Sequence, residues 1–509
     1  MKFKILFFVS MLLGVYSRAQ VPEDALRLSW LNPTGTARNQ AVGGAMGSLG
    51  GDITASFVNP AGIGLYKTSE FVISPGFSFL NNKSTYRESN ASVTNNSFNL
   101  GTSGLVIGFS NRNGKLKSGA FSIAVNRTAN FNTNINYSGE NDFSSYSEQY
   151  AAELAGSKIP IGNALNFDAP LTLGTKMAIY SYLIDTATIN GNLQVIGLPE
   201  GLASRGQQNY IQSKGGITEI AMGLAGNADD KIYFGGSIGI PIVNYERLST
   251  FTERDLSGNT NNDFDYSTLT ETYTTKGIGL NAKVGIIFKP VSDVRLGLAI
   301  HSPTLYGFKD TYHGDMATST EKYAGLVKVT SETVSGNAAS EYKYDLVSPW
   351  KVLLSGSYMF HEVEDVTKQR GFISADVEYI NYKASTYQTA DQNSSDNSQY
   401  TEVNNAIDDA YKGSFNFKLG GELKFETIMV RAGFAHYGNP YKDSELKGSR
   451  NFISGGVGYR DNGFFVDLTY VYGLQKDVNF PYRLSDRPNT FAEVKGVSAN
   501  IILTVGFKF

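Results

Sequence analysis

The feature that most constrains this chain is an alternation of apolar and polar side chains that recurs from residue 70 to the last residue. Alternation with a period of two predicts β-strands, because successive side chains of a strand point to opposite faces. The segments that carry it are 70–79, 103–111, 118–127, 217–226, 231–240, 275–289, 293–302, 350–361, 371–382, 413–426, 428–438, 451–460, 464–473 and 495–509. These fourteen segments predict an all-β fold.

The links between these segments alternate in length. Short links lie at 111–117, 227–230, 290–292, 361–370, 427 and 461–463, and long links at 80–102, 128–216, 241–274, 303–349, 383–412, 439–450 and 474–494. Brief turns at one end and long loops at the other are typical of outer-membrane barrels. We therefore predict an all-β membrane protein, with a 14-stranded antiparallel transmembrane β-barrel at residues 70–509 and long extracellular loops.

The N-terminus has the pattern of a secretory signal peptide. Residues 1–4 are basic, a short apolar stretch follows, and small residues precede a cleavage site after Ala19. Beyond residue 19, no stretch offers the roughly 18–20 continuous apolar residues that a spanning helix needs. A closed barrel is the other structure that satisfies every backbone polar group in lipid. The sequence thus predicts a signal peptide at 1–19 and the outer membrane of a Gram-negative bacterium.

Charged residues within the strands fall on one face. In 413–426, for example, Phe415, Phe417 and Leu419 alternate with Asn416 and Lys418. A Lys or Arg on the lipid face at mid-membrane would cost about 2–4 kcal/mol, so the charges are expected to line the lumen. The predicted lumen-wall residues are Asp376, Glu378, Lys418, Glu422, Lys424, Arg431 and Asp467. We expect them to form an ion network of mixed sign, with a dedicated ligand site as the alternative.

Composition excludes several classes of protein. Lys plus Arg number 44 against 47 Asp plus Glu, which gives no basic surplus for nucleic acid binding. The chain has no Cys, and its four His residues show no metal-binding or hydrolase spacing. The stretch 255–265 has oxygen ligands at alternate positions but lacks the Glu of a calcium loop. We therefore predict no catalytic residue, no metal site and no cofactor.

The two ends of the mature chain carry further signals. The last strand ends on Phe509, and an unpaired, aromatic-tipped edge needs a partner before the barrel closes, so we expect it to contact the barrel-assembly machinery. Residues 20–69 are not barrel-like. Glycines cluster between residues 43 and 51, which allows close backbone packing, and Asn59-Pro60 breaks any helix. We predict an N-terminal plug, or hatch, at 20–69.

Several short motifs are similar to those of a known family. They are residues 35–38, 43–52, 59–62 and 66–71, with later matches at 238–241, 296–304 and 376–379. On these motifs the chain resembles the FadL-type long-chain fatty-acid transporter family, also called outer membrane protein transport proteins, in its Bacteroidetes branch. The resemblance implies passive uptake of hydrophobic molecules, above all long-chain fatty acids, past a hatch and out through the barrel wall. It also implies that Asn59, Pro60 and Ala61 shape that path.

Two features of the path stay open from the sequence. The family opening depends on a kinked strand, and 118–127 contains no residue that obviously imposes a kink. Pro75 and Gly76 would disrupt ladder bonding and are the candidate opening. Segment 143–155 is expected to form an amphipathic loop helix that either packs the loop onto the barrel rim or captures cargo.

Other functions also stay open. One alternative is a non-transporting structural or adhesive barrel, and another is a haem receptor, although no pair of histidines is spaced to hold iron. A barrel lipid hydrolase would need His301 and Ser302 to act together, yet neighbours on a strand point to opposite faces. We expect a monomeric channel that is not an enzyme, whose partners are a fatty-acid-like molecule and outer-membrane lipid.

Overall fold

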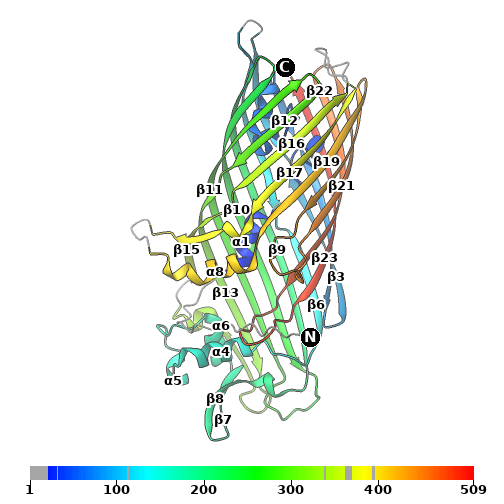
Figure 1. Ribbon diagram of the computed structural model, residues 1–509. Coiled ribbons are helices and arrows are strands. Elements are labelled where there is room, and N and C mark those ends of the chain that lie inside the picture. Colours follow the sequence, from blue (N-terminus) through cyan, green and yellow to red (C-terminus); the bar gives the residue numbers. More distant parts are fainter. Residues whose placement is uncertain (1–20, 31, 112–113, 338–339, 361–369, 392–395) are drawn as a thin grey trace, which may run out of the picture.

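The computed structural model describes residues 21–30, 32–111, 114–337, 340–360, 370–391 and 396–509. The predicted signal peptide, residues 1–19, lies outside them. Fourteen antiparallel strands close into a barrel (Figure 1), which confirms the predicted fold class. In the part of the chain that the structure describes, no helix has both the length and the apolar character needed to cross a membrane.

Several barrel strands are interrupted, so more than fourteen numbered elements make up the wall. In chain order the wall consists of β1 (Glu70–Ile73), β2 (Pro75–Tyr86), β3 (Ser89–Leu100), β4 (Ser103–Ser110), β5 (Leu116–Asn130), β6 (Thr133–Asn141), β9 (Arg205–Ala228), β10 (Ile232–Asp255), β11 (Tyr266–Val291), β12 (Val294–His301), β13 (Leu305–Ser319), β15 (Ser340–Val347), β16 (Lys351–Phe360), β17 (Gly371–Asn381), β18 (Thr386–Thr389), β19 (Gly413–Phe425), β20 (Ile428–Tyr437), β21 (Arg450–Asp461), β22 (Phe464–Asn479) and β23 (Ala492–Lys508). Pairing of β1 with β23 joins the first strand to the last and closes the barrel.

The remaining elements lie inside the barrel or in the long links. Before the wall come α1 (Pro22–Ser29), α2 (Ala37–Ala41), α3 (Ala55–Val58) and the 3-10 helix η1 (Pro60–Leu65). The long links contain α4 (Glu148–Ser157), α5 (Ile161–Ala164), α6 (Leu173–Tyr180), β7 (Ile184–Ile189), β8 (Asn192–Gly197), η2 (Leu198–Gly201), β14 (Leu326–Thr330), α7 (Ser331–Val334), η4 (Tyr382–Ala384), η5 (Ser398–Tyr400) and α8 (Thr401–Ala410). Residues 142–204, here called the outgrowth, extend from the long-link end of the barrel (Figure 1).

The two faces of the wall differ as the alternation predicted. On β19, Phe417 and Leu419 are 50% and 49% exposed on the outside, whereas Asn416 is fully buried. The same holds around the barrel, where large apolar side chains such as Ile286, Val457 and Leu503 face outward. The apolar side chains form a belt that runs from the short-turn end to about the middle of the longest strands.

The strands are longer than predicted. β9, β10 and β11 have 24, 24 and 26 residues and continue well into the predicted loops 128–216 and 241–274, and β2 and β3 fill most of 80–102. Beyond the apolar belt the outward residues are threonine, glutamine and other polar residues, so the apolar signal ends where the strand does not. The hydrogen-bonded ladder still continues there, for example from Tyr245 opposite Thr275 to Arg254 opposite Tyr266.

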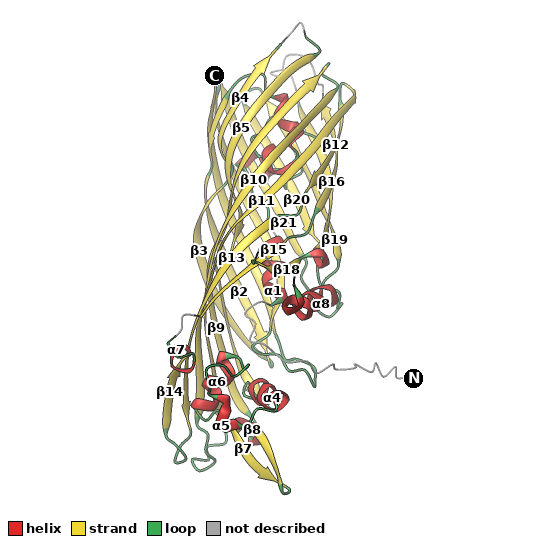
Figure 2. Ribbon diagram, turned by 90° about the vertical axis from the view of Figure 1, so that its left-hand side faces the viewer, coloured by secondary structure: helices red, strands yellow, loops and turns green. Residues whose placement is uncertain are grey.

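Residues 35–66 lie inside the barrel, where Figure 2 shows helices between the walls toward the end that carries the C-terminus. Inward-facing glycines of the wall leave room for this segment. A Cβ on Gly433 of β20 would lie 2.1 Å from the backbone nitrogen of Gly43, and one on Gly285 of β11 would lie 1.9 Å from Oδ1 of Asn59. Gly43 itself has a φ of +65°, which a residue with a Cβ seldom adopts. The segment and the wall are therefore fitted to each other at backbone distance.

This fit predicts the effect of one added methyl group. Gly433→Ala should force the segment away from β20 and lower the free energy of unfolding by about 1–3 kcal/mol, as overpacking does elsewhere. Thermal and urea unfolding of the purified barrel in detergent would measure the change. The control is Gly455→Ala on β21, where the nearest heavy atom to the new Cβ is 3.8 Å away. Equal stability of the two variants would contradict the close fit.

Candidate functional site

Hydroxyl groups of the wall hold the N-terminal segment inside the barrel. The Ala37 amide donates to Oγ1 of Thr504 at 2.7 Å, and Oγ1 of Thr469 donates to the Ala37 carbonyl at 2.7 Å. On other strands, Ser237 donates to the Ser56 carbonyl at 2.8 Å. Similar bonds come from Ser118 to Gly64 and from Ser454 to Ala41. Since these hydroxyls come from β5, β10, β21, β22 and β23, the segment is held from several sides of the lumen.

Asn59, Pro60 and Ala61 lie where α3 gives way to η1, toward the end of the segment, and are all buried. Nδ2 of Asn59 donates to the Gly47 carbonyl at 2.6 Å and to the Ile286 carbonyl of β11 at 3.3 Å. Its Oδ1 accepts from the Ala61 amide at 3.1 Å, and Pro60 begins η1. Asn59 thus ties two turns of the segment to each other and to the wall.

One ion network joins the segment to strands β19–β22. Arg431 is 2% exposed, and it donates from Nε to Glu422 at 2.5 Å and from Nη1 to Asp467 at 2.6 Å. Arg38 of the segment lies 3.5 Å from Glu422, and Arg460 lies 3.9 Å from Asp467. Five of the charges that face this part of the lumen are therefore placed so that opposite signs touch.

Of the other predicted lumen residues, Asp376, Glu378 and Lys418 lie closer to the long-link end of the barrel. Asp376 accepts from the Gly47 amide at 3.0 Å and from Ser355 at 2.5 Å. Glu378 accepts from Asn416 at 2.8 Å and lies 3.3 Å from Nζ of Lys351 and 3.7 Å from Nζ of Lys418. The last member, Lys424, is half-buried on the same face of β19, nearer the short-turn end.

Breaking the Arg431 network tests how firmly the lumen is closed. Arg431→Met would leave Glu422 and Asp467 buried without their main cation, which should cost about 3–5 kcal/mol of unfolding free energy. The conservative variant Arg431→Lys keeps a cation between Glu422 and Asp467 and should lose less stability, although an ammonium group cannot bond both carboxylates as the guanidinium does. Urea unfolding of the three proteins in detergent measures both losses, and wild-type stability of Arg431→Met would contradict the network's role.

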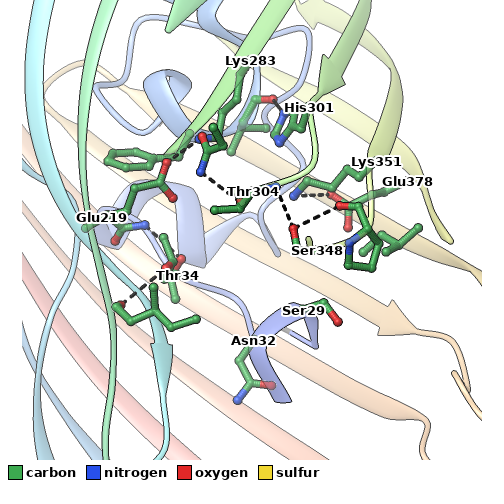
Figure 3. A pocket seen from close by; sticks show the side chains of 18 of the residues that line it. Ser29, Asn32, Thr34, Glu219, Lys283, His301, Thr304, Ser348, Lys351 and Glu378 are labelled. Carbon is green, nitrogen blue, oxygen red and sulfur yellow. Dashed lines mark hydrogen bonds and ion pairs between the residues drawn. The ribbon is translucent and has the colours of Figure 1, made fainter. Parts of the chain in front are cut away.

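A polar cavity of about 170 Å³ lies against the segment, on the side of the long-link end. Figure 3 shows Lys283, His301, Lys351 and Glu378 around it, with the end of α1 at Ser29 on the opposite side. Lys283 is ion-paired with Glu219, and Nε2 of His301 is 2.8 Å from the Val58 carbonyl. The charged and titratable groups named here, which line this cavity, therefore already have partners within the protein.

The wall is not laddered everywhere. β4 pairs with β5 from Ser103 opposite Val125 to Ser110 opposite Ser118. Farther toward the long-link end, no backbone ladder joins residues 89–100 to residues 127–141, all of which the structure describes. One barrel strand is interrupted between β3 and β4, and the next is interrupted between β5 and β6. The pairing of β5 with β9 also shifts register between Arg127 and Ala129. We call this unladdered part of the wall the seam.

Asparagine side chains bridge the seam in place of backbone bonds. Asn130 donates to Oγ of Ser97 at 2.9 Å, and Asn134 donates to the Thr94 carbonyl at 3.2 Å. Asn82 reaches across to Oγ1 of Thr133 at 2.8 Å. Bonds of this kind can open by side-chain rotation, whereas a ladder opens only when the strands separate.

A second cavity, of about 300 Å³, reaches the seam from inside and is called the seam cavity here. It touches both sides of the seam, at Asn99 of β3 on one side and at Asn130 and Phe131 on the other. Its inner wall is α1, with Leu26, Arg27 and Trp30. Asn32, Pro33 and Thr34 line both cavities, so the two adjoin.

The pairing does not support an opening at Pro75 and Gly76. Pro75 lies opposite Leu100, and Gly76 lies opposite Asn99 on one side and Ile502 on the other. The ladder with β23 keeps a single register through this point, from Ile73 opposite Val505 onward. The part of the wall without a backbone ladder lies instead between β3 and β5–β6.

Comparison with solved structures gives the same architecture. The crystal structure of a Pseudomonas aeruginosa FadL homologue matches with a TM-score of 0.54 and 13% identity over 94% of this chain and 99% of that one. The toluene transporters TodX of Pseudomonas putida and TbuX of Ralstonia pickettii match with TM-scores of 0.48 and 0.47, identities of 12% and 13%, and the same coverage of 94% and 99%. No protein-family model and no curated protein sequence matches. The chain shares the fold of the FadL homologue.

The residues considered for catalysis and metal binding do not converge. His301 points into the lumen, whereas Ser302 is exposed and donates to the Pro303 carbonyl, so the two do not form a nucleophile–base pair. Within the described ranges, no group of three or more His, Asp or Glu side chains is arranged to hold a metal ion.

The predicted loop helix of 143–155 corresponds to α4 in the outgrowth. Tyr146, Tyr150 and Leu154 are buried, and the Tyr146 ring lies 4.7 Å from the ring of Phe251 on β10. Phe143 stays exposed. The helix thus uses its apolar face to pack the outgrowth onto the barrel rim.

A buried carboxylate fastens the same junction. Glu253 of β10 is fully buried above the apolar belt and accepts hydrogen bonds from Ser145 at 2.6 Å and Gln207 at 2.6 Å. Burial raises the pKa of Glu253 above its ordinary value of 4.5, although the hydrogen bonds oppose the shift. Since the folded state favours the protonated carboxyl, the contribution of Glu253 to stability is greatest below pH 4.5. That contribution is lost as the pH rises through the folded-state pKa.

The junction should therefore loosen with rising pH. Hydrogen–deuterium exchange of residues 142–204, corrected for intrinsic rates, should show less protection at pH 8 than at pH 5 in the wild type. Glu253→Gln should remove that difference, because an amide has no charge to desolvate. The exposed Glu402→Gln is the control and should behave like the wild type; an unchanged pH profile in Glu253→Gln would contradict the assignment.

Several functional residues escaped the sequence prediction. Arg38 and Glu219 complete ion pairs with partners far away in the chain, so no local pattern could join them. The seam did leave a trace, since asparagine replaces apolar residues at 130, 132 and 134. That loss of alternation looks like a loop in the sequence.

Proposed function

We propose that the protein is an outer-membrane channel of the FadL type that takes up hydrophobic molecules passively, with long-chain fatty acids as its substrate class. The observation that carries this proposal is the seam cavity. It reaches an unladdered part of the wall while the lumen beneath it is filled by residues 35–66. A molecule that enters from the long-link end therefore has a sideways route but no straight one.

The outward face supports a place in a membrane. Its apolar belt covers about a dozen residues of each strand, counted from the short-turn end. This is about the length that a tilted strand needs to cross a hydrocarbon layer of about 30 Å. The short-turn end would then face the periplasm after removal of a signal peptide, and the outgrowth would lie outside the cell.

The lining of the seam cavity supports an amphiphilic cargo. Leu26, Trp30 and Phe131 offer apolar and aromatic surface, and Arg247 faces the same cavity. No hydrogen bond or ion pair to the Arg247 guanidinium is found among the described residues; it lies over the ring of Tyr273, with 5.7 Å between the guanidinium carbon and the ring centroid. An unpaired guanidinium beside an apolar surface suits a carboxylate on a hydrocarbon chain.

The segment 20–69 acts in this proposal as the hatch. Asn59, Pro60 and Ala61 keep its turns against β11, so cargo in the seam cavity meets a closed floor. Release then takes place through the seam between β3 and β5–β6 into the membrane. We also propose that the barrel acts as a monomer and that its C-terminal strand, ending in the exposed Phe509, is the edge read by the assembly machinery.

Locking the seam tests the route directly, because the chain has no natural cysteine. Ser97→Cys with Asn130→Cys places two thiols where a side-chain hydrogen bond of 2.9 Å now bridges the seam. A short, reducible bis-thiol cross-linker should stop uptake of a radiolabelled long-chain fatty acid by cells that depend on this protein. Reduction of the cross-link should restore uptake.

The matched control joins two strands that are already laddered. Ile107→Cys with Phe121→Cys links outward positions that lie opposite each other on β4 and β5. This cross-link should leave uptake unchanged. Full uptake through a barrel with a cross-linked seam would overturn lateral release, and absence of fatty-acid uptake by cells that carry the wild-type protein would overturn the substrate class.

A further inference from the structure

Two rows of lysines stand out on the outer face of the barrel. In the first row, Lys276 of β11 lies opposite Lys309 of β13, which lies opposite Lys343 of β15. In the second row, Lys83 of β2 lies opposite Lys495 of β23, which lies opposite Lys476 of β22. All six side chains are exposed.

Direct opposition of like charges is unfavourable in a sheet. Side chains opposite each other on neighbouring strands have Cβ atoms about 4.5–5.5 Å apart, and like charges in that position repel. Each row concentrates three ammonium groups over about 10 Å, since neighbouring strands lie about 4.8 Å apart. An arrangement of this kind needs counter-charges close by.

The protein supplies only part of that counter-charge. Glu341 lies 2.6 Å from Lys309, and Glu493 lies 3.6 Å from Lys495. Asp345 follows Lys343 two positions along β15. Lys83, Lys276, Lys343 and Lys476 have no ion pair among the described residues. The positions that flank the rows in register, such as Ser92 opposite Lys83 and Asn244 opposite Lys276, are neutral.

Both rows lie at the long-link edge of the apolar belt. Toward the belt, the next outward residue after Lys276 is Ile278, and the next after Lys476 is Leu474; these are 58% and 47% exposed. Two residues of a strand span about 6.6 Å, which brings the ammonium groups to the depth of lipid headgroups. The two rows also lie on opposite sides of the barrel, because four strands separate them in either direction around the wall.

We propose that each lysine row binds a phosphate-bearing lipid headgroup of the leaflet that surrounds the long-link end of the barrel. Lysine ammonium groups pair with phosphate as point charges, and lysines at a membrane surface attract anionic lipid. The lipid phosphates supply the missing counter-charge and hold the barrel at a fixed height on two opposite sides. This inference rests on the proposed membrane location but on no part of the uptake route.

Native mass spectrometry of the purified full-length barrel in non-ionic detergent tests the proposal. The probe is a bis-phosphorylated glycolipid, compared with the same glycolipid lacking both phosphates and with inorganic phosphate. The first row variant is Lys276→Gln, Lys309→Gln, Lys343→Gln, and the second is Lys83→Gln, Lys476→Gln, Lys495→Gln. The control is Lys115→Gln, Lys158→Gln, Lys231→Gln, which removes three exposed lysines far from the rows.

The wild type and the control should bind the phosphorylated glycolipid alike, and each row variant should lose about half of the tightly bound molecules. Loss of all six lysines should weaken binding by at least about tenfold, since each lysine near a membrane surface contributes about 1 kcal/mol, a factor of about five. Row variants should melt no lower than the wild type without lipid, which excludes misfolding as the cause.

Three outcomes would overturn the proposal. The first is that the phosphate-free glycolipid binds as well as the phosphorylated one. The second is that inorganic phosphate binds as well as the phosphorylated glycolipid. The third is that the six-lysine variant binds the phosphorylated glycolipid as well as the wild type does. Fatty-acid uptake by the first row variant in the seam assay should stay at the wild-type level, because none of its three lysines lines the seam cavity, whereas Lys476 of the second row does. Failure of the lysine rows and failure of the uptake route are therefore read from different measurements.

Discussion

The rest of this structure depends on how backbone hydrogen bonds are satisfied. A sheet whose outer face is apolar must close on itself, because an open edge would leave donors and acceptors without partners. Pairing of β1 with β23 achieves closure, and fourteen strands then fix a lumen wide enough to hold a folded segment. At the seam the described wall departs from this rule, and there asparagine side chains supply bonds that bridge the two sides.

A filled lumen and an incomplete wall belong together. The hydroxyls and charges that line the lower lumen bind the backbone and side chains of residues 35–66, so the polar inner face is satisfied by protein. The cavity that remains lies between this segment and the long-link end, and it reaches the wall at the seam. Polar residues of the kind that face water in an empty barrel here bind the segment instead.

The sequence predicted the fold because lipid and strand geometry leave a strong local signal. Phe417 and Lys418 alternate on β19 in a way that only a two-faced wall explains, and the charged members of the lumen could be named from that alternation. The signal ended where the outward face of a strand becomes polar, as at Thr268–Thr274 of β11, so the strand extensions read as loops. Contacts such as Arg38 with Glu422 join positions hundreds of residues apart and leave no local pattern.

Register carries information that composition does not. Lys83, Lys476 and Lys495 are ordinary exposed lysines in the sequence, and they become a row only when β2, β22 and β23 are aligned. The seam is the opposite case, since it arises from bonds that two neighbouring strands do not make. Neither feature could be predicted without knowing which residues face each other.

The bond between Ala37 and Thr504 spans 467 positions of the chain. The N-terminal segment therefore has one of its partners on β23, the strand that closes the barrel. Until that strand arrives, the glycine-rich segment has no complete surface to pack against. Assembly of this barrel must bring the two ends of the chain together around an interior already occupied by its own N-terminus, so closing the wall and sealing the lumen become a single event.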